Sequence, residues 1–111
     1  MKKLFKNYLY DFSSSEKKIL ATMVKQILRQ IEGDEKYFNE IRIYKSLSEK
    51  LQSSQTPIKL TKEEIKRLEL QLSENAKVLK GKIKRSIFFL KWLYKPLLNQ
   101  YESILNKHFK D

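Results

Sequence analysis

Apolar residues recur at helical spacing in two stretches, each of which begins with a helix-capping signal and runs up to a glycine. The signals are Ser13 with Glu16 and Thr61 with Glu64. In such a pair the hydroxyl and the carboxylate can each accept a hydrogen bond from the backbone N–H of the other residue. The apolar positions behind them are Ile19, Leu20, Met23, Val24, Ile27, Leu28 and Ile31 before Gly33, and Ile65, Leu68, Leu72, Ala76 and Leu79 before Gly81. Each stretch predicts a helix that begins at a capping box and ends at a glycine.

The capping signals and the glycines repeat at one offset along the chain. Ser13 and Thr61 are separated by 48 positions, and so are Gly33 and Gly81. The side chains between these landmarks match poorly. The landmarks themselves suggest two helical hairpins built on one plan.

A second helix follows the first glycine. Asp34 and Glu35 supply the acidic first turn that a helix dipole favours. An apolar stripe then runs through Tyr37, Phe38, Ile41, Tyr44, Leu47 and Leu51. The polar stretch 52–59 contains Pro57 and breaks the periodicity, so it predicts a linker.

The last part of the chain has an apolar seam that alternates spacings of four and three residues, which is the pattern of a helix that packs on a partner helix. The seam consists of Ile83, Ile87, Leu90, Tyr94, Leu97, Tyr101, Ile104 and His108. Pro96 lies within it, so the helix either kinks near Lys95 or restarts there. The kink is favoured because the seam stays in phase across the proline. If the seams of two copies of the chain packed against each other instead, the protein would be a homodimer.

These patterns predict an all-α protein. The expected architecture is a four-helix bundle of two antiparallel hairpins in a single domain, 1–111, with a long last helix kinked at Pro96. The first hairpin covers 13–51, the linker 52–60 and the second hairpin 61–109. No β-strand is expected, and the apolar residues among positions 4–12 could add a short helix.

Composition narrows the range of functions. The 111 residues include only two Gly and no Cys. A dinucleotide fingerprint or a phosphate-cradling loop needs several closely spaced glycines, and a β-rich fold needs many turn residues. Without Cys there are no disulfides, thiolate nucleophiles or thiolate metal sites. The composition therefore argues against a glycine-rich phosphate-binding loop and a β-rich fold, and it excludes disulfides and thiolate sites.

Targeting signals are weak. Lys6, Asn7 and Asp11 interrupt the apolar region that a secretory signal requires. The most apolar window, 86–98, is too short to span a bilayer and contains Lys91 and Lys95. No transmembrane segment and a cytoplasmic location are therefore expected.

Catalytic and metal-binding candidates are sparse. The only histidine, His108, lies near the end of the chain, and the run 13–15 of serines has no base nearby in sequence. Glu63 and Glu64 are explained by the helix start. Glu32, Asp34 and Glu35 cluster around a turn but lack the alternating oxygen ligands and central glycine of a calcium loop. No catalytic residue, cofactor or metal site is expected, and the protein is predicted not to be an enzyme.

The formal net charge is +11, and much of it lies in one region. Between Asn75 and Leu98 there is no acidic residue. The positive residues of this region are Lys77, Lys80, Lys82, Lys84, Arg85, Lys91 and Lys95. The same window contains Phe88, Phe89 and Trp92, which fall beside or away from the seam.

Three interpretations of this region stay open. In the first, the aromatic rings complete a wide core stripe. The lysines then reflect a lysine-rich composition and only keep the outer face of the helix in contact with water. In the second, the positive residues neutralise phosphates and an aromatic ring stacks on an unpaired base. In the third, a basic amphipathic helix docks on a protein or a membrane surface.

The leading hypothesis is a non-enzymatic regulatory protein that binds RNA or DNA, or a nucleic-acid-handling complex, through the seven positive residues. The alternative is a protein-interaction module, such as an inhibitor, an antitoxin-like protein or a mobile-element adaptor, that docks through Phe88, Phe89 and Trp92. An acidic protein surface would suit the same positive residues. No zinc-ligand spacing and no basic region leading into a leucine zipper is present, so the signal carries no sequence specificity.

Overall fold

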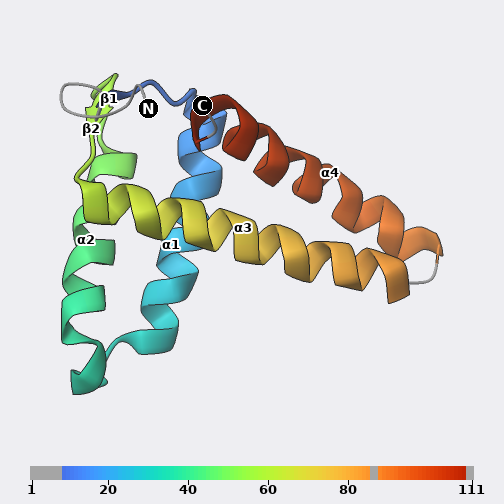
Figure 1. Ribbon diagram of the computed structural model, residues 1–111, viewed down its shortest axis with the longest axis horizontal. Helices are drawn as coiled ribbons and strands as arrows, with labels where there is room; N and C mark the ends of the chain where they lie inside the picture. The colour runs from blue at the N-terminus through green and yellow to red at the C-terminus, as the bar shows by residue number, and fades with distance from the viewer. Residues whose placement is uncertain (1–8, 86–87, 110–111) are drawn as a thin grey trace. The chain divides into compact units, whose positions relative to one another are not determined.

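The computed structural model describes the backbone of residues 9–85 and 88–109 and, within these ranges, the side chains outside 85–93 (Figure 1). The elements in chain order are β1 (Leu9–Tyr10), α1 (Ser14–Ile31), the 3₁₀ helix η2 (Glu35–Tyr37), α2 (Phe38–Gln52), β2 (Ile58–Lys59), α3 (Lys62–Arg85), α4 (Phe88–Ile104) and the π-helical turn η3 (Leu105–Phe109). The mostly helical class, built from helical hairpins, is confirmed. Two compact units divide the chain, Met1–Lys66 and Arg67–Asp111, and the division falls inside α3.

The first unit contains the hairpin of α1 and α2, which run antiparallel side by side (Figure 1). The predicted turn is present at Gly33, whose φ of 89° lies in the left-handed region that favours glycine. Both helices bury the middle of the stripe that the sequence predicts, but Phe38 of the predicted stripe is 72% exposed and Ile43, outside the prediction, is buried. The buried side chains are Leu20, Met23, Val24 and Leu28 on α1 and Ile43, Tyr44, Leu47 and Leu51 on α2.

The first unit also contains a small antiparallel sheet, so the expectation of no β-strand is wrong, and so is the suggested short helix at residues 9–12. The rest of that suggested helix, 4–8, lies outside the described residues. Leu9 pairs with Lys59, and Tyr10 pairs with Ile58. On each chain segment, a buried residue alternates with an exposed one in strand fashion: the buried side chains are Tyr10, Phe12, Ile58 and Leu60. Two-residue strands are too short for this alternation to stand out in the sequence.

The two capping boxes have the same geometry. Ser13 N–H donates to Glu16 Oε1 over 2.8 Å, and Thr61 N–H donates to Glu64 Oε1 over 2.8 Å. The reverse bonds, from Glu16 N–H to Ser13 Oγ and from Glu64 N–H to Thr61 Oγ1, both measure 3.1 Å. Both predicted helix starts are therefore confirmed.

Burial repeats at the same offset of 48 positions as the caps. The buried pairs are Tyr10 and Ile58, Phe12 and Leu60, Glu16 and Glu64, Leu20 and Leu68, Val24 and Leu72, and Leu28 and Ala76. The sheet pairs Tyr10 with its own equivalent, Ile58. Each half of the chain therefore follows the order strand, capped helix, second helix.

The second unit differs from the prediction at Gly81, which lies inside α3 rather than after it. The helix continues because Ile83 packs, with Tyr94, Leu97 and Tyr101, against the buried cluster of Ala76, Leu79 and Leu98. Pro96 lies inside α4, which continues to Ile104 without restarting. The partner helix for this part of the seam is thus α3 of the same chain.

The two glycines predict opposite effects of substitution by alanine. A Cβ at Gly33 would meet no atom within 4 Å, so Gly33→Ala should cost about 1 kcal/mol through backbone strain alone. Gly81→Ala should raise stability by up to about 1 kcal/mol because alanine is the better residue in a helix interior. Urea unfolding of both variants measures the two effects. Shifts in the same direction would contradict the assignment of one glycine to a turn and the other to a helix.

Candidate polyanion interface

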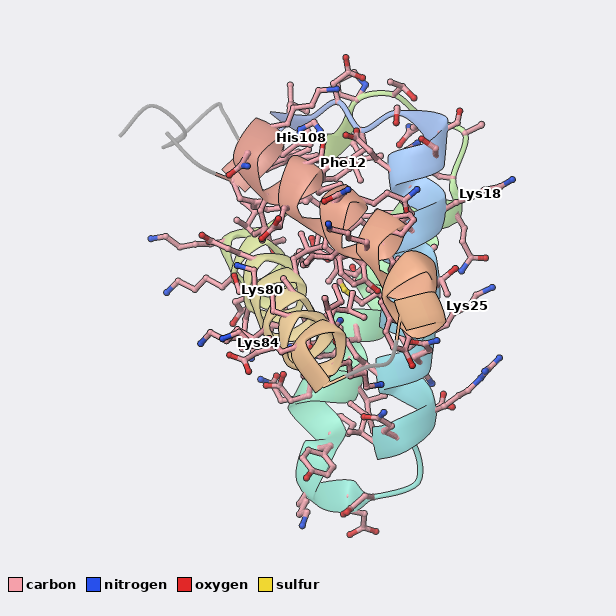
Figure 2. The ribbon with its side chains drawn as sticks, turned by 90° about the vertical axis from the view of Figure 1, so that its right-hand side faces the viewer. Phe12, Lys18, Lys25, Lys80, Lys84 and His108 are labelled. Atoms are coloured by element: carbon pink, nitrogen blue, oxygen red, sulfur yellow. The ribbon has the colours of Figure 1, made fainter. Side chains whose placement is uncertain are left out.

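Four of the predicted lysines lie on one side of the α3–α4 hairpin. Lys77, Lys80 and Lys84 follow one another at intervals of three and four residues, so they share one side of α3. Figure 2 shows the side chains of Lys80 and Lys84 pointing the same way. Lys80 Nζ lies 3.0 Å from Glu102 Oε2 on α4, and Lys95 precedes Glu102 by two helical turns. We call Lys77, Lys80, Lys84 and Lys95 the basic side.

Carboxylates partly neutralise the basic side. Lys80 is paired with Glu102, and Lys77 Nζ lies 3.8 Å from Glu74 Oε2. A shallow groove of about 400 Å³ runs between the two helices and is lined by Glu69, Ser73, Ala76, Lys77, Lys80, Glu102, Leu105 and Asn106. Lys84 and Lys95 are exposed and form no ion pair with a described residue. These two ammonium groups carry the positive charge that is still available for a partner.

The other predicted positive residues separate from this side. Lys82 lies on another face of α3, with its Nζ 5.7 Å from the centroid of the Tyr94 ring in cation–π geometry. The side chains of Arg85 and Lys91 lie outside the described residues. The predicted docking rings Phe88, Phe89 and Trp92 lie outside them as well. Because α3 continues as a helix through Gly81, Lys82 lies on a different face from Lys80 and Lys84.

The side chains of Tyr101, which is half-buried, and His108, which is buried, pack into the fold near the end of the chain. Tyr101 packs against the α3–α4 cluster, and burial raises the pKa of its hydroxyl. His108 is buried in the π-helical turn. Both residues have the packing role that their positions on the seam predict.

Glu64 is a buried carboxylate of the first unit that accepts hydrogen bonds from three residues. Its side chain is only 3% exposed and accepts hydrogen bonds from Lys50 Nζ over 2.7 Å, from Ser46 Oγ over 2.7 Å and from Thr61 N–H. Burial alone would raise its pKa, but the hydrogen bonds from Lys50, Ser46 and Thr61 outweigh burial, so the pKa is lowered. Glu64 therefore has the capping role predicted for it and also joins α2 to the start of α3.

The lowered pKa of Glu64 predicts a loss of stability in acid. The ionised carboxylate favours folding, and this contribution is complete above the ordinary pKa of 4.5 and disappears as the pH falls through the lower folded value. The difference in unfolding free energy between the wild type and Glu64→Gln should therefore shrink as the pH falls below 4.5. Urea unfolding at a series of pH values measures it. A difference that stays constant with pH would contradict the assignment.

A second set of positive residues lies on α1, outside the predicted region. Lys18, Lys25 and Arg29 are spaced by seven and four residues and therefore share one face of the helix. Figure 2 shows Lys18 and Lys25 pointing the same way. The sequence does show the helical spacing of these three residues. They were missed because positive charge was judged by its density along the chain, which is not high in this region.

In the part of the chain that the structure describes, no group of three or more His, Asp or Glu side chains is placed to hold a metal ion. No described helix has the length and apolar character needed to cross a bilayer. No protein-family model, curated protein or solved structure matches the chain.

Proposed function

We propose that this protein is a non-enzymatic, regulatory nucleic-acid-binding protein that contacts RNA or DNA, or a nucleic-acid-handling complex, through the basic side of the α3–α4 hairpin. Lys77, Lys80, Lys84 and Lys95 would meet phosphates, with release of the counterions that surround them. The protein would act by occupancy, since the proposal assigns it no chemical step.

One observation carries the proposal: Lys84, on the side of α3 that carries Lys80, and Lys95, on the side of α4 that carries Glu102, are exposed and form no ion pair with a described residue. The ion pairs of Lys77 and Lys80 do not oppose it, because exposed pairs contribute little stability and a phosphate can replace the carboxylate. Recognition of this kind depends on the phosphate backbone and supplies affinity without reading bases.

We further propose that the protein acts in the cytoplasm. Nucleic acid is abundant there, and a chain without cysteine needs no oxidising compartment for its fold. Docking through Phe88, Phe89 and Trp92 stays a prediction, since those side chains are not described. A homodimer also stays a prediction, which sedimentation at two protein concentrations tests.

Copurification from the native host, with and without nuclease treatment, tests the proposed function. We expect nucleic acid to elute with the tagged protein and to disappear after nuclease treatment or a wash at high salt. An acidic protein that elutes in constant amount with and without nuclease, with no nucleic acid present, would overturn the proposal in favour of a protein partner.

A further inference from the structure

A groove of about 590 Å³ runs along α1 in the first unit, between the face that carries Lys18, Thr22 and Lys25 and the segment 51–56. These three residues follow at intervals of four and three, so they lie in line along the helix. The opposite wall contributes Ser53, Ser54 and Thr56, and the buried side chains of Phe12 and Leu51 border the groove. The fold brings these walls together from distant parts of the sequence.

Lys17 fixes the second wall against the helix. Its Nζ donates hydrogen bonds to the backbone carbonyl of Ser53, over 3.2 Å, and to that of Gln55. Ser53 is also held by its own hydroxyl, which donates to the Lys50 carbonyl over 2.8 Å. The segment that faces Lys18 and Lys25 is therefore positioned before any ligand arrives, which lowers the entropy cost of binding.

Charge distinguishes this groove from the one between α3 and α4. Its charged lining residues are three lysines, Lys17, Lys18 and Lys25, without a carboxylate among them. The one acidic residue of α1, Glu16, is buried in the capping box. Lys18 and Lys25 are exposed and form no ion pair with a described residue. An anion here would meet two ammonium groups and several hydroxyl donors without displacing a carboxylate.

The spacing of the lysines indicates the size of that anion. Lys18 and Lys25 are seven residues apart, which is a rise of about 10.5 Å along the helix axis. One phosphate cannot lie close to both stems, whereas successive phosphates of a chain can meet one ammonium each. Arg29, one turn further along the same face, extends the line of charge.

From this arrangement we infer that the α1 groove binds consecutive phosphate groups, supplied by a nucleic-acid strand or by a free polyphosphate. The inference goes beyond the proposed function, because the groove lies in the other unit and uses none of the residues of the basic side. Lys18 and Lys25 bind the phosphates, the hydroxyls of Thr22, Ser54 and Thr56 donate hydrogen bonds, and Lys17 positions the segment 51–56.

Thermal unfolding with inorganic tripolyphosphate as the probe tests the inference. Tripolyphosphate should raise the melting temperature of the wild type, because a ligand that binds only the folded state stabilises it. The double variant Lys18→Gln/Lys25→Gln should lose this rise. The matched control Lys62→Gln/Lys66→Gln removes the same charge from two exposed residues of the first unit and should keep it. Melting without tripolyphosphate checks that each variant folds.

An equal rise in the wild type and in Lys18→Gln/Lys25→Gln, or no rise in the wild type, would overturn the inference. A labelled single-stranded oligothymidylate separates the two sources of phosphate. An oligonucleotide that loses affinity in Lys18→Gln/Lys25→Gln but not in the control supports a nucleic-acid strand, and a response to tripolyphosphate alone supports a free polyphosphate. Failure of the wild type to bind any oligonucleotide would count against the proposed function and leave the tripolyphosphate result intact.

Discussion

Replacing Glu64 with alanine should lower the free energy of unfolding by about 2 to 4 kcal/mol. The substitution removes the carboxylate that completes the capping box of α3 and leaves the hydroxyl of Ser46 and the ammonium of Lys50 without their acceptor. Breaking a fully buried ion pair costs more, about 3 to 5 kcal/mol. The Lys50 side chain is 32% exposed and regains water, which places the expected cost toward the lower end.

Glu63→Ala is the matched control, since Glu63 is the exposed neighbour of Glu64 in the same first helical turn. It loses only a favourable interaction with the helix dipole, so we expect a cost of less than about 1 kcal/mol. Chemical denaturation of the two variants at neutral pH measures the difference. Equal costs would show that the hydrogen bonds of Glu64 do not join α2 to α3 as described.

Reversing the charge of Lys84 and Lys95 together should reduce nucleic-acid affinity roughly tenfold or more at low salt, because two attractive contacts become repulsive. Both side chains are exposed, and neither forms an ion pair with a described residue, so the fold should survive with little change in stability. Lys82 is left unchanged because its ammonium lies over the Tyr94 ring, where a carboxylate would disturb packing.

The control for this variant is Lys62→Glu/Lys66→Glu, which makes the same change in net charge at exposed positions of the first unit. Fluorescence anisotropy of a labelled single-stranded oligonucleotide gives both affinities. If the control loses as much affinity as Lys84→Glu/Lys95→Glu, net charge alone controls binding and the basic side is not the interface.

The sequence predicts the helical part of this fold well where a local interaction decides the structure. Ser13 with Glu16 and Thr61 with Glu64 each close a capping box within four residues, so both helix starts were predictable. Gly33 was predictable as a turn for the same reason. The apolar stripes of α1 and α2 repeat often enough to identify the face that each helix buries.

Features that depend on distant residues were not predictable in the same way. The β1–β2 sheet joins Tyr10 to Ile58, and each strand alone is too short to give a pattern. The continuation of α3 through Gly81 depends on Ile83 reaching the cluster with Leu98, which no local rule reveals. Gly81, which lies as far from its capping box as Gly33 does from its own, therefore has a different role.

The candidate site was predictable only as a region of the chain. The density of positive residues along the chain identified Lys77, Lys80, Lys84 and Lys95. It did not predict that Glu102, on the other helix, pairs with Lys80. The α1 groove was missed for a related reason. Its two walls are joined by hydrogen bonds between Lys17 and the segment 51–56, which lies more than thirty positions away in sequence.

The most direct test of the central claim is the salt dependence of the affinity of the wild-type protein for a single-stranded oligonucleotide. If two to four lysines of the basic side contact phosphates, a plot of the logarithm of the binding constant against the logarithm of salt concentration should have a slope of about −1.4 to −2.8. The slope should be steeper if the α1 groove also binds the strand. A slope near zero, or no binding at low salt, would contradict the account.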